Sequence, residues 1–408
     1  MGLPSPIGEQ LARLRARRGL TQEDLAARAG VGVDVVRRLE QGVRSTARLA
    51  TLARLAKALD VGLPTLMAQP DVLTTSSPSS AGKGMLDLRR VLTPSDALTG
   101  FAAHGDADVG APTLEALSAS IEEAWGLYQE GSYSAVVASL PDLIAELRHA
   151  VRDSADVDKV VLNESMATAC EIAAGVAIAL GKEDLAFIAV ERAVAAAEAS
   201  GSELQQACAA NFATWILCRQ GRYDEAEAFA VRAAQHFEPS LSRADAPHVA
   251  VFGALLINAS AAASRNDRAA SCRDLLGVAR AAAARYQIDH ADRQAVFGPS
   301  VVAMSAVSDA VEYGDLDEAL RLVDEVPEDG RVPETWRARY LLNVAYVQQQ
   351  ARKDADAVAT LMQVRALAPE WMTYHPLGRD VVAELLDRRG RRRMPELGVL
   401  ADHLGVRA

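Results

Sequence analysis

Residues Thr21–Gly42, TQEDLAARAGVGVDVVRRLEQG, contain the pattern that decides the fold at the N-terminal end of the chain. Thr21 is a typical helix N-cap, and Asp24 follows three residues later, close to the spacing of a capping box. The Gly-Val-Gly sequence at 30–32 interrupts the helical pattern, and the apolar residues of VVRRLE then begin a second buried stripe. The stretch therefore predicts two short helices joined by a tight turn, with two arginines facing outward from the second helix.

These residues also resemble a known family of DNA-binding domains. The pattern T-Q-E-x-L-A-x-x-A-G-V followed by V-x-x-L-E-Q-G is similar to the phage-repressor type, Xre/Cro, over Ile7–Met67. The family usually has Ser or Thr as the N-cap of its recognition helix, whereas this chain has Gly32, a weaker cap. The resemblance implies a five-helix DNA-binding domain over residues 1–69, with a fourth helix at 49–59 and a fifth at Leu63–Met67. The alternative is an unrelated helical hairpin.

By this resemblance, Val33, Asp34 and Arg38 are the base-reading positions of the second helix. Arg38 can donate two parallel hydrogen bonds to guanine O6 and N7, and Val33 can pack on a thymine methyl group. Asp34 has two interpretations: it accepts a hydrogen bond from cytosine N4, or it holds Arg38 as an i,i+4 partner. We favour the second, because phosphates repel a bare carboxylate.

Phosphate contacts are predicted for four further residues of this domain: Gln22, Arg37, Arg44 and Arg48. Gln22 stands at a helix start, where backbone N–H groups also meet phosphate. For Arg48, a solvated surface charge is an equally good interpretation. One such head makes few phosphate contacts, so we expect a homodimer that binds double-stranded DNA at an inverted-repeat operator.

The composition predicts packed helices and an uneven distribution of charge. The chain has 408 residues, of which 50% are hydrophobic, and Ala predominates with few β-branched runs, which favours an all-α fold. The net charge is −11, but residues 1–69 contain eleven Lys or Arg and six Asp or Glu, so the remainder carries −16. A basic head on an acidic body suits a head that contacts phosphate and a body that does not.

The sequence contains no motif of an enzyme, a cofactor site or a metal site. The four cysteines are widely spaced with no C-x-x-C pair, which is typical of buried thiols in a reducing cytosol. Nucleophile-elbow, zinc-protease, phosphate-loop and dinucleotide motifs are missing. No uninterrupted apolar run reaches about 18 residues, so no membrane span is predicted. We therefore expect a cytoplasmic protein with no catalytic residues, cofactor or metal.

Residues 70–112 are predicted to be a linker, because TTSSPSSAGKG at 74–84 cannot bury enough apolar surface to order itself, although 86–92 could dock. From 113 to 408, similar turns recur 38 to 50 residues apart; they begin at Gly131, Gly181, Gly221, Asn266, Gly314 and Arg352. Each follows a long Ala-rich helix and precedes a shorter one. This pattern predicts six helical hairpins, with two further helices near the end as a seventh pair or a cap.

The body resembles the tetratricopeptide repeat, through W-G-x-Y-x-x-G at 125–131 and A-L-A-P at 366–369. That family packs helix pairs into a right-handed superhelical solenoid with a concave inner surface. An Xre-type head on such a body resembles the RRNPP regulators and related long regulators of actinobacteria, and the stretches 299–315 and 395–401 are similar to the actinobacterial group. The resemblance implies that residues 113–408 dimerise and bind a signal, either a short secreted peptide, as in quorum sensing, or another small signal.

Four of the five asparagines lie inside predicted first helices of hairpins: Asn163, Asn211, Asn258 and Asn343. Asn is a poor residue for a helix interior, so these positions suggest a purpose. An amide can hold an extended peptide backbone, and the resemblance implies this role for inner-helix asparagines. The alternative is an asparagine whose amide is satisfied by a neighbouring helix. Because the last three stand at different distances from their turns, we expect that they do not all share one face.

Trp215 and Arg219 follow Asn211 by four and eight residues, on the same predicted helix face. These three side chains form the candidate wall of a ligand pocket. For Trp215, the alternative is ordinary packing between repeats.

The predicted function is sequence-specific regulation of transcription, in which the helical body binds a signal that modulates DNA binding. The alternative is a regulator or scaffold whose body binds a partner protein instead.

Overall fold

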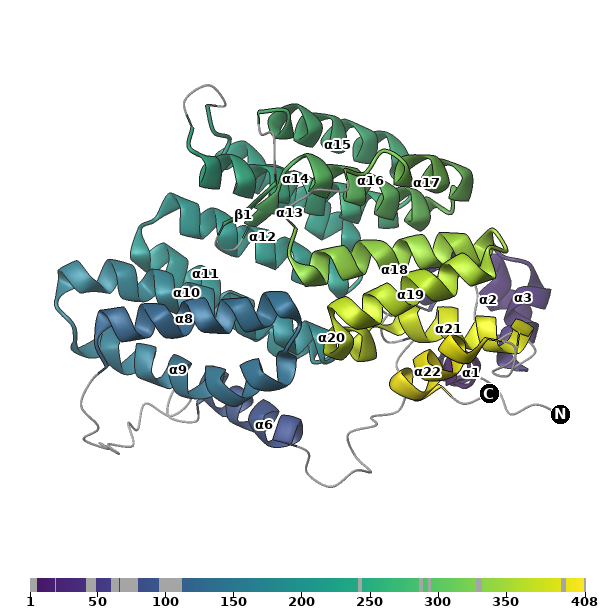
Figure 1. The fold of residues 1–408 in the computed structure, drawn as a ribbon, viewed down its shortest axis with the longest axis horizontal. Coiled ribbons are helices and arrows are strands. Elements are labelled where there is room, and N and C mark those ends of the chain that lie inside the picture. The colour runs from purple at the N-terminus through teal and green to yellow at the C-terminus, as the bar shows by residue number, and fades with distance from the viewer. Residues whose placement is uncertain are drawn as a thin grey trace.

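A computed structural model describes residues 6–18, 20–41, 49–59, 66, 80–94, 112–240, 244–285, 289–292, 295–327, 332–389 and 394–406. The described chain is helical apart from one two-stranded hairpin, so the predicted all-α class is confirmed. Figure 1 shows a small N-terminal head and a large body of stacked helices.

The head contains four described helices: α1 (Pro6–Arg17), α2 (Gln22–Ala29), α3 (Val33–Glu40) and α4 (Leu49–Ala58). They enclose one apolar core, whose fully buried leucines come from α1, α2, α3 and α4 alike. The predicted fifth helix at Leu63–Met67 lies outside the described residues except for Leu66, which is buried in this core. The predicted stop at Gly42 also lies outside them.

The helix-turn-helix forms as the local sequence predicts. The Thr21 hydroxyl accepts a hydrogen bond from the Asp24 backbone N–H at 3.0 Å, and the Asp24 carboxylate accepts one from the Thr21 backbone N–H at 2.9 Å. Gly30 then adopts the left-handed conformation at φ 62°, which ends α2. Gly32 caps α3 without a side-chain hydrogen bond, as expected for glycine at this position.

The body is a series of antiparallel hairpins, six in the described residues, followed by three terminal helices. The helices are α8 (Leu114–Glu130), α9 (Tyr133–Asp153), α10 (Asp156–Ala179), α11 (Glu183–Ser200), α12 (Glu203–Arg219), α13 (Tyr223–His236), α14 (Ala246–Arg265), α15 (Ala269–Ala283), α16 (Pro299–Tyr313), α17 (Leu316–Val323), α18 (Glu334–Gln350), α19 (Asp354–Leu367), α20 (Pro369–Tyr374), α21 (Pro376–Arg389) and α22 (Pro395–Leu404). The predicted hairpins and closing pair are therefore present.

All six predicted hairpin turns contain a residue in the left-handed conformation. Four of these residues are glycines, at which positive φ costs little. The other two are Asp267 at φ 59° and Arg352 at φ 64°, where the Cβ atom makes the same conformation strained. The turn geometry is thus common to all six hairpins even where glycine is replaced.

The first hairpin lies against the last ones, so the body closes on itself. The Thr335 hydroxyl of α18 donates to the Gln129 carbonyl oxygen of α8 at 2.9 Å. The Ser134 hydroxyl and backbone N–H at the start of α9 both donate to the Glu370 carboxylate of α20, at 2.6 and 2.8 Å. In Figure 1, α20 correspondingly lies beside the end of α8 and α9. The first helices of the hairpins therefore surround a closed interior.

Part of the predicted linker, Ser80–Leu92, is a helix that docks on the body. Helix α6 (Ser80–Leu92) packs on α9 and α11, and its Leu88 and Leu92 are fully buried. Arg148 of α9 also donates a hydrogen bond to the Val91 carbonyl oxygen. The apolar face of 86–92 supplies the burial that the preceding Ser- and Gly-rich residues lack.

A small antiparallel hairpin that the sequence does not predict lies between α15 and α16. Strand β1 (His290–Asp292) pairs with β2 (Ala295–Phe297), with His290 opposite Phe297. Asp289, just before β1, accepts hydrogen bonds from the backbone N–H groups of Ser300 and Val301 at the start of α16. A three-residue strand is too short to show a periodic pattern, so the sequence does not predict it.

Two described helices are long and apolar enough, by length and composition alone, to cross a membrane: Asp158–Ala179 and Ala246–Arg265. Within the body, however, 72% and 67% of their most apolar windows are buried, which is typical of core helices.

The turn geometry generates a stability prediction. Gly314→Ala should destabilise the chain by about 1 kcal/mol, because φ is 75° there and the space around the new Cβ is empty. Arg352→Gly should stabilise it by a smaller amount, because relief of strain is partly offset by a more flexible unfolded chain. Urea unfolding followed by circular dichroism measures both.

The matched control is Gly277→Ala, inside α15, where a Cβ also meets open space but the conformation is helical. It should stabilise the chain, since Ala is the better helix former. Equal effects of Gly314→Ala and Gly277→Ala would contradict the conformational explanation.

Candidate functional site

Helix α3 presents a polar face outward from the head. Asp34, Arg37 and Arg38 are exposed, whereas Val36 and Leu39 on the opposite side are fully buried. Val33 is half-buried and packs partly against the head core. This is the geometry required of a recognition helix, because its exposed side chains can enter a DNA groove while its core residues hold its position.

Asp34 pairs with a different arginine from the one expected. Its carboxylate lies 3.5 Å from the Arg37 guanidinium, and Glu23 of α2 lies 3.8 Å from the same guanidinium. The expected i,i+4 partner was Arg38, so that interpretation is corrected: the i,i+3 spacing brings Arg37 closer. Arg38 is exposed, and Asp34 pairs with Arg37 instead of with Arg38.

A buried carboxylate joins the two ends of the helix-turn-helix, and the sequence analysis missed it. The Glu40 side chain at the end of α3 is only 6% exposed. Arg15 of α1 donates to both of its oxygens, at 2.7 and 2.8 Å, and also to the Leu20 carbonyl oxygen at 2.8 Å. The hydrogen bonds with Glu40 raise the pKa of Arg15. The two-point pairing fixes the orientation of α3 relative to α1.

Gln22 belongs to the same cluster. Its amide Nε2 donates to Glu40 at 2.7 Å, so Gln22 positions α3 as well as standing at the start of α2. The amide group retains a second N–H and an acceptor oxygen, so a phosphate contact remains a prediction. The other two predicted phosphate contacts, Arg44 and Arg48, lie outside the described residues.

In the body, the candidate asparagines are hydrogen-bonded to protein groups. Asn258 of α14 donates to the Asn211 side-chain oxygen of α12 at 2.8 Å, and Asn343 of α18 donates to the Ser308 hydroxyl of α16 at 2.8 Å. Asn163 donates to the Lys159 carbonyl oxygen of its own helix at 2.7 Å.

Asn211 and Asn258 contact each other, whereas Asn343 is bonded to Ser308 instead of to either of them. The alternative, an amide satisfied by a neighbouring helix, describes both inter-helix pairs. Each amide nevertheless has unused hydrogen-bonding capacity, because one N–H and further acceptor positions remain.

Trp215 lies at one end of a continuous row of aromatic rings through the interior. The ring centroids are 5.5 to 6.3 Å apart in the order Trp215, Phe212, Trp125, Tyr128, Tyr133 and Tyr374. We call these six residues the aromatic row. It joins α12 to α8, α9 and α20, so it crosses the closed interior from the third hairpin to the first. Packing between repeats, the alternative given for Trp215, is observed.

Arg219 is partly buried one turn beyond Trp215. Desolvation lowers its pKa, and the nearby Arg265 lowers it further. Its Nε–H has no hydrogen-bond partner in the described part of the chain. Arg265 of α14 is balanced instead, because its guanidinium lies 2.7 Å from the Glu312 carboxylate.

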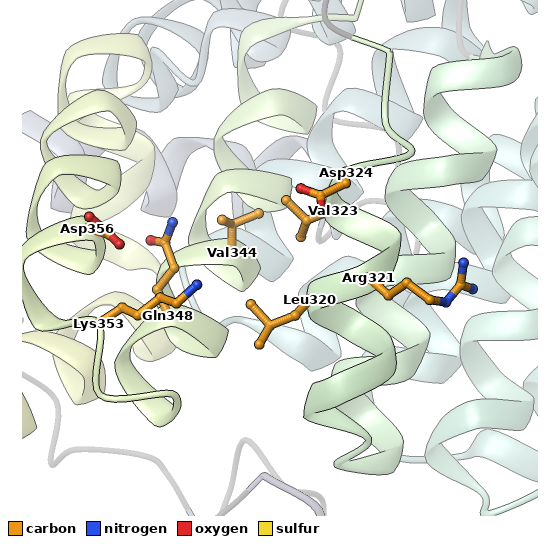
Figure 2. Close-up of a pocket in the computed structure, with 8 residues that line it drawn as sticks. All are labelled: Leu320, Arg321, Val323, Asp324, Val344, Gln348, Lys353 and Asp356. Carbon is orange, nitrogen blue, oxygen red and sulfur yellow. The ribbon is translucent and has the colours of Figure 1, made fainter.

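A separate cavity of about 310 Å³ lies between α17, α18 and α19. Its lining residues, drawn in Figure 2, are Leu320, Arg321, Val323, Asp324, Val344, Gln348, Lys353 and Asp356. None of the predicted ligand residues lines it. Among the described residues, no group of three or more His, Cys, Asp or Glu is arranged to hold a metal ion, and all four cysteines are buried, unbridged thiols.

Comparison with known proteins identifies the head. A family model described as a helix-turn-helix domain matches residues 6–69. The uncharacterized HTH-type transcriptional regulator y4dJ of Sinorhizobium fredii is 38% identical over 71 residues, which are 17% of this chain and 91% of that protein. The uncharacterized HTH-type transcriptional regulator RghRB of Bacillus subtilis is 41% identical over 64 residues, or 16% of this chain. The chain spans about half of the length of RghRB, 46%.

One solved structure aligns with a larger part of the chain. It is that of Bacillus thuringiensis PlcR in complex with the peptide PapR7 and DNA, with 16% sequence identity over 68% of this chain and 94% of that one. The TM-score is 0.28.

The buried Glu40 cluster generates a prediction for the head. Glu40→Ala should destabilise the head by about 2–3 kcal/mol, because it leaves the charge of Arg15 and the amide of Gln22 without their partner. In the full-length chain, hydrogen exchange of the α1–α3 amides should accelerate, while exchange in α10–α14 stays unchanged.

The control is Glu23→Ala, which removes an exposed carboxylate 3.8 Å from Arg37. Surface ion pairs contribute little, so exchange in α1–α3 should hardly change. A response to Glu23→Ala as large as that to Glu40→Ala would contradict the role given to the cluster.

Proposed function

We propose, for a chain that belongs to the HTH-type transcriptional regulators, that the helical body is a sensor whose bound signal controls DNA binding by the head. The head makes the protein a DNA-binding transcriptional regulator. The signal we propose is a short peptide in extended conformation, and the working unit is a homodimer on an inverted-repeat operator.

The observation that carries this proposal is the polar interior of the closed body. Buried polar groups cost free energy unless they are hydrogen-bonded, and an Ala-rich solenoid could close with apolar residues alone. Instead, the first helices of four hairpins carry amides and a hydroxyl that pair from helix to helix, Asn211 with Asn258 and Ser308 with Asn343. Groups that both donate and accept can exchange these bonds for those of a peptide backbone.

The position of the head supports the coupling between signal and DNA. Helix α4 contacts α16, and α16 also carries Ser308, which is bonded to Asn343 of α18. A ligand that binds next to α16 can therefore favour one head position over another. Such a signal controls DNA binding only if it has different affinities for the two arrangements.

DNA recognition by α3 is tested with two neighbouring arginines. Arg38→Ala should reduce discrimination between the selected operator and a scrambled duplex by about 1–3 kcal/mol, because a bidentate contact to guanine is lost. The operator comes from selection out of random duplexes, and fluorescence anisotropy measures both affinities.

Arg37→Ala is the matched variant on the same helix, and it should weaken binding to both duplexes alike. An equal loss of discrimination in the two variants would contradict the division between base and phosphate contacts.

The sensor role is tested on the inner amides. Operator affinity is measured with and without the peptide fraction of conditioned medium. Asn258→Ala should preserve basal operator affinity but reduce the response to the peptide fraction about tenfold, because one contact with the peptide backbone is lost. Asn266→Ala, at the outer turn after the same helix, should respond like the unaltered protein.

A response that is identical in Asn258→Ala and the unaltered protein would contradict the amide role. Stoichiometric co-purification of a partner protein, with no response to any peptide, would favour a body that binds proteins.

A further inference from the structure

Arg339 lies inside the closed body, where helices from distant hairpins meet. It comes from α18, yet its guanidinium carbon is 6.0 Å from the ring centroid of Trp215 on α12. Its charge also acts on Tyr128 and Tyr133, of α8 and α9. These elements belong to the sixth, third and first hairpins, which can approach one another only across the interior.

The interior around Arg339 is accessible as well as enclosed. The Arg339 side chain is exposed to solvent, although desolvation is the largest of the effects that lower its pKa. Arg339 is therefore accessible to a ligand, although many protein atoms surround it. The Trp215 ring, at one end of the aromatic row, supplies an apolar surface against the guanidinium.

Arg339 differs from Arg265 of the same body in the charged groups around it. The strongest influences on Arg339 in the described part of the chain are Arg219, Tyr128, Tyr133 and Arg265, of which none is a carboxylate. His375 stands close to the same cations, and desolvation together with Arg339 and Arg219 holds its pKa well below the usual value, so it is neutral.

Two buried nitrogens of this cluster, Arg219 Nε and His375 Nδ1, lack a hydrogen-bond partner in the described residues. Arg219 has one acidic neighbour, Glu183, whose pKa is raised by desolvation. Arg265, in contrast, has a carboxylate at 2.7 Å and a carbonyl oxygen at 2.8 Å. The cluster therefore combines the positive charges of Arg339 and Arg219 with a buried Arg219 N–H that has no acceptor among the described residues.

We propose that Arg339 and Arg219, with Trp215 holding the guanidinium of Arg339, bind a carboxylate of the signal ligand. This inference rests on the proposed sensor function and adds its ligand chemistry. A planar carboxylate matches the donor fork of a guanidinium, and the aromatic row suits an apolar group next to it. In a peptide, that carboxylate is either the free C-terminus or an acidic side chain.

An unoccupied cation cluster should reduce stability, and this gives a readout that needs no ligand. Arg339 and Arg219 repel each other in a desolvated space, so Arg339→Gln should raise the melting temperature of the full chain by about 2–4 °C. Arg337→Gln, on the exposed side of the same helix, should leave it unchanged. A lower melting temperature for Arg339→Gln would mean that the arginine is a structural residue, and it would overturn the proposal.

The ligand test uses defined probes with the full-length protein. N-acetyl-L-phenylalanine should raise the melting temperature, and its neutral amide should not. Random heptapeptides without Asp or Glu but with a free C-terminus are compared with C-amidated heptapeptides that contain one Glu. Affinity selection identifies which of the two pools supplies the carboxylate, and Arg339→Gln and Arg219→Gln should each reduce its capture at least tenfold.

The outcomes separate this inference from the sensor function. Equal capture of peptides by the unaltered protein and both variants would overturn the carboxylate site and support peptide sensing. Stabilisation by N-acetyl-L-phenylalanine, lost in both variants, with no capture of either pool, would support the site and contradict the peptide. No response to any probe would overturn both.

Discussion

The contact between the first hairpin and the last ones constrains the rest of the body. Gln129 and Ser134 are bonded to Thr335 and Glu370, more than 200 positions later in the chain. A Cβ at Gly131 would lie 2.8 Å from the Trp371 Cβ atom, so the two ends also meet too closely for a larger residue. Because this contact closes the series of hairpins, their first helices face one another around a shared interior.

A closed interior changes what its polar residues can do. On an open concave surface, an asparagine would be solvated; here Asn258 bonds Asn211, and Asn343 bonds Ser308. The amides are held in fixed orientations, which lowers the entropic cost of ordering them around a ligand. The cations follow another rule: Arg265 has an internal carboxylate, whereas Arg339 faces aromatic rings and a second arginine. By this comparison Arg265 is a structural arginine, and Arg339 is the arginine for which we propose a carboxylate ligand.

In the head, the orientation of the helices likewise depends on a single contact point, the buried carboxylate of Glu40. Glu40 receives hydrogen bonds from α1 and from the start of α2, so three elements are oriented by one buried charge. Arg37 and Arg38 lie on the exposed face of α3, the helix whose orientation Glu40 fixes. Precise placement of a recognition helix matters because a bidentate contact to a base tolerates little displacement.

Most of the helix boundaries could be predicted from the sequence because they depend on neighbours along the chain. The capping box at Thr21, the left-handed turns from Gly131 to Arg352 and the apolar stripes of the head are interactions within a few residues. The candidate site can be predicted only in part: the sequence places Asn211, Trp215 and Arg219 on one helix, but it does not predict the pairing of Asn211 with Asn258. The place of Arg339 in the interior could not be predicted, because nothing in the sequence distinguishes it from the other helical arginines.

What the tertiary structure alone decided is which distant groups meet. Helix α6 docks because α9 offers an apolar surface, Asp34 selects Arg37 over Arg38, and Arg339 reaches Trp215 because the body closes. The physical reason is range: caps, turns and helix periodicity are set by contacts a few residues apart, whereas ion pairing, desolvation and ring contacts depend on groups brought together by the whole fold.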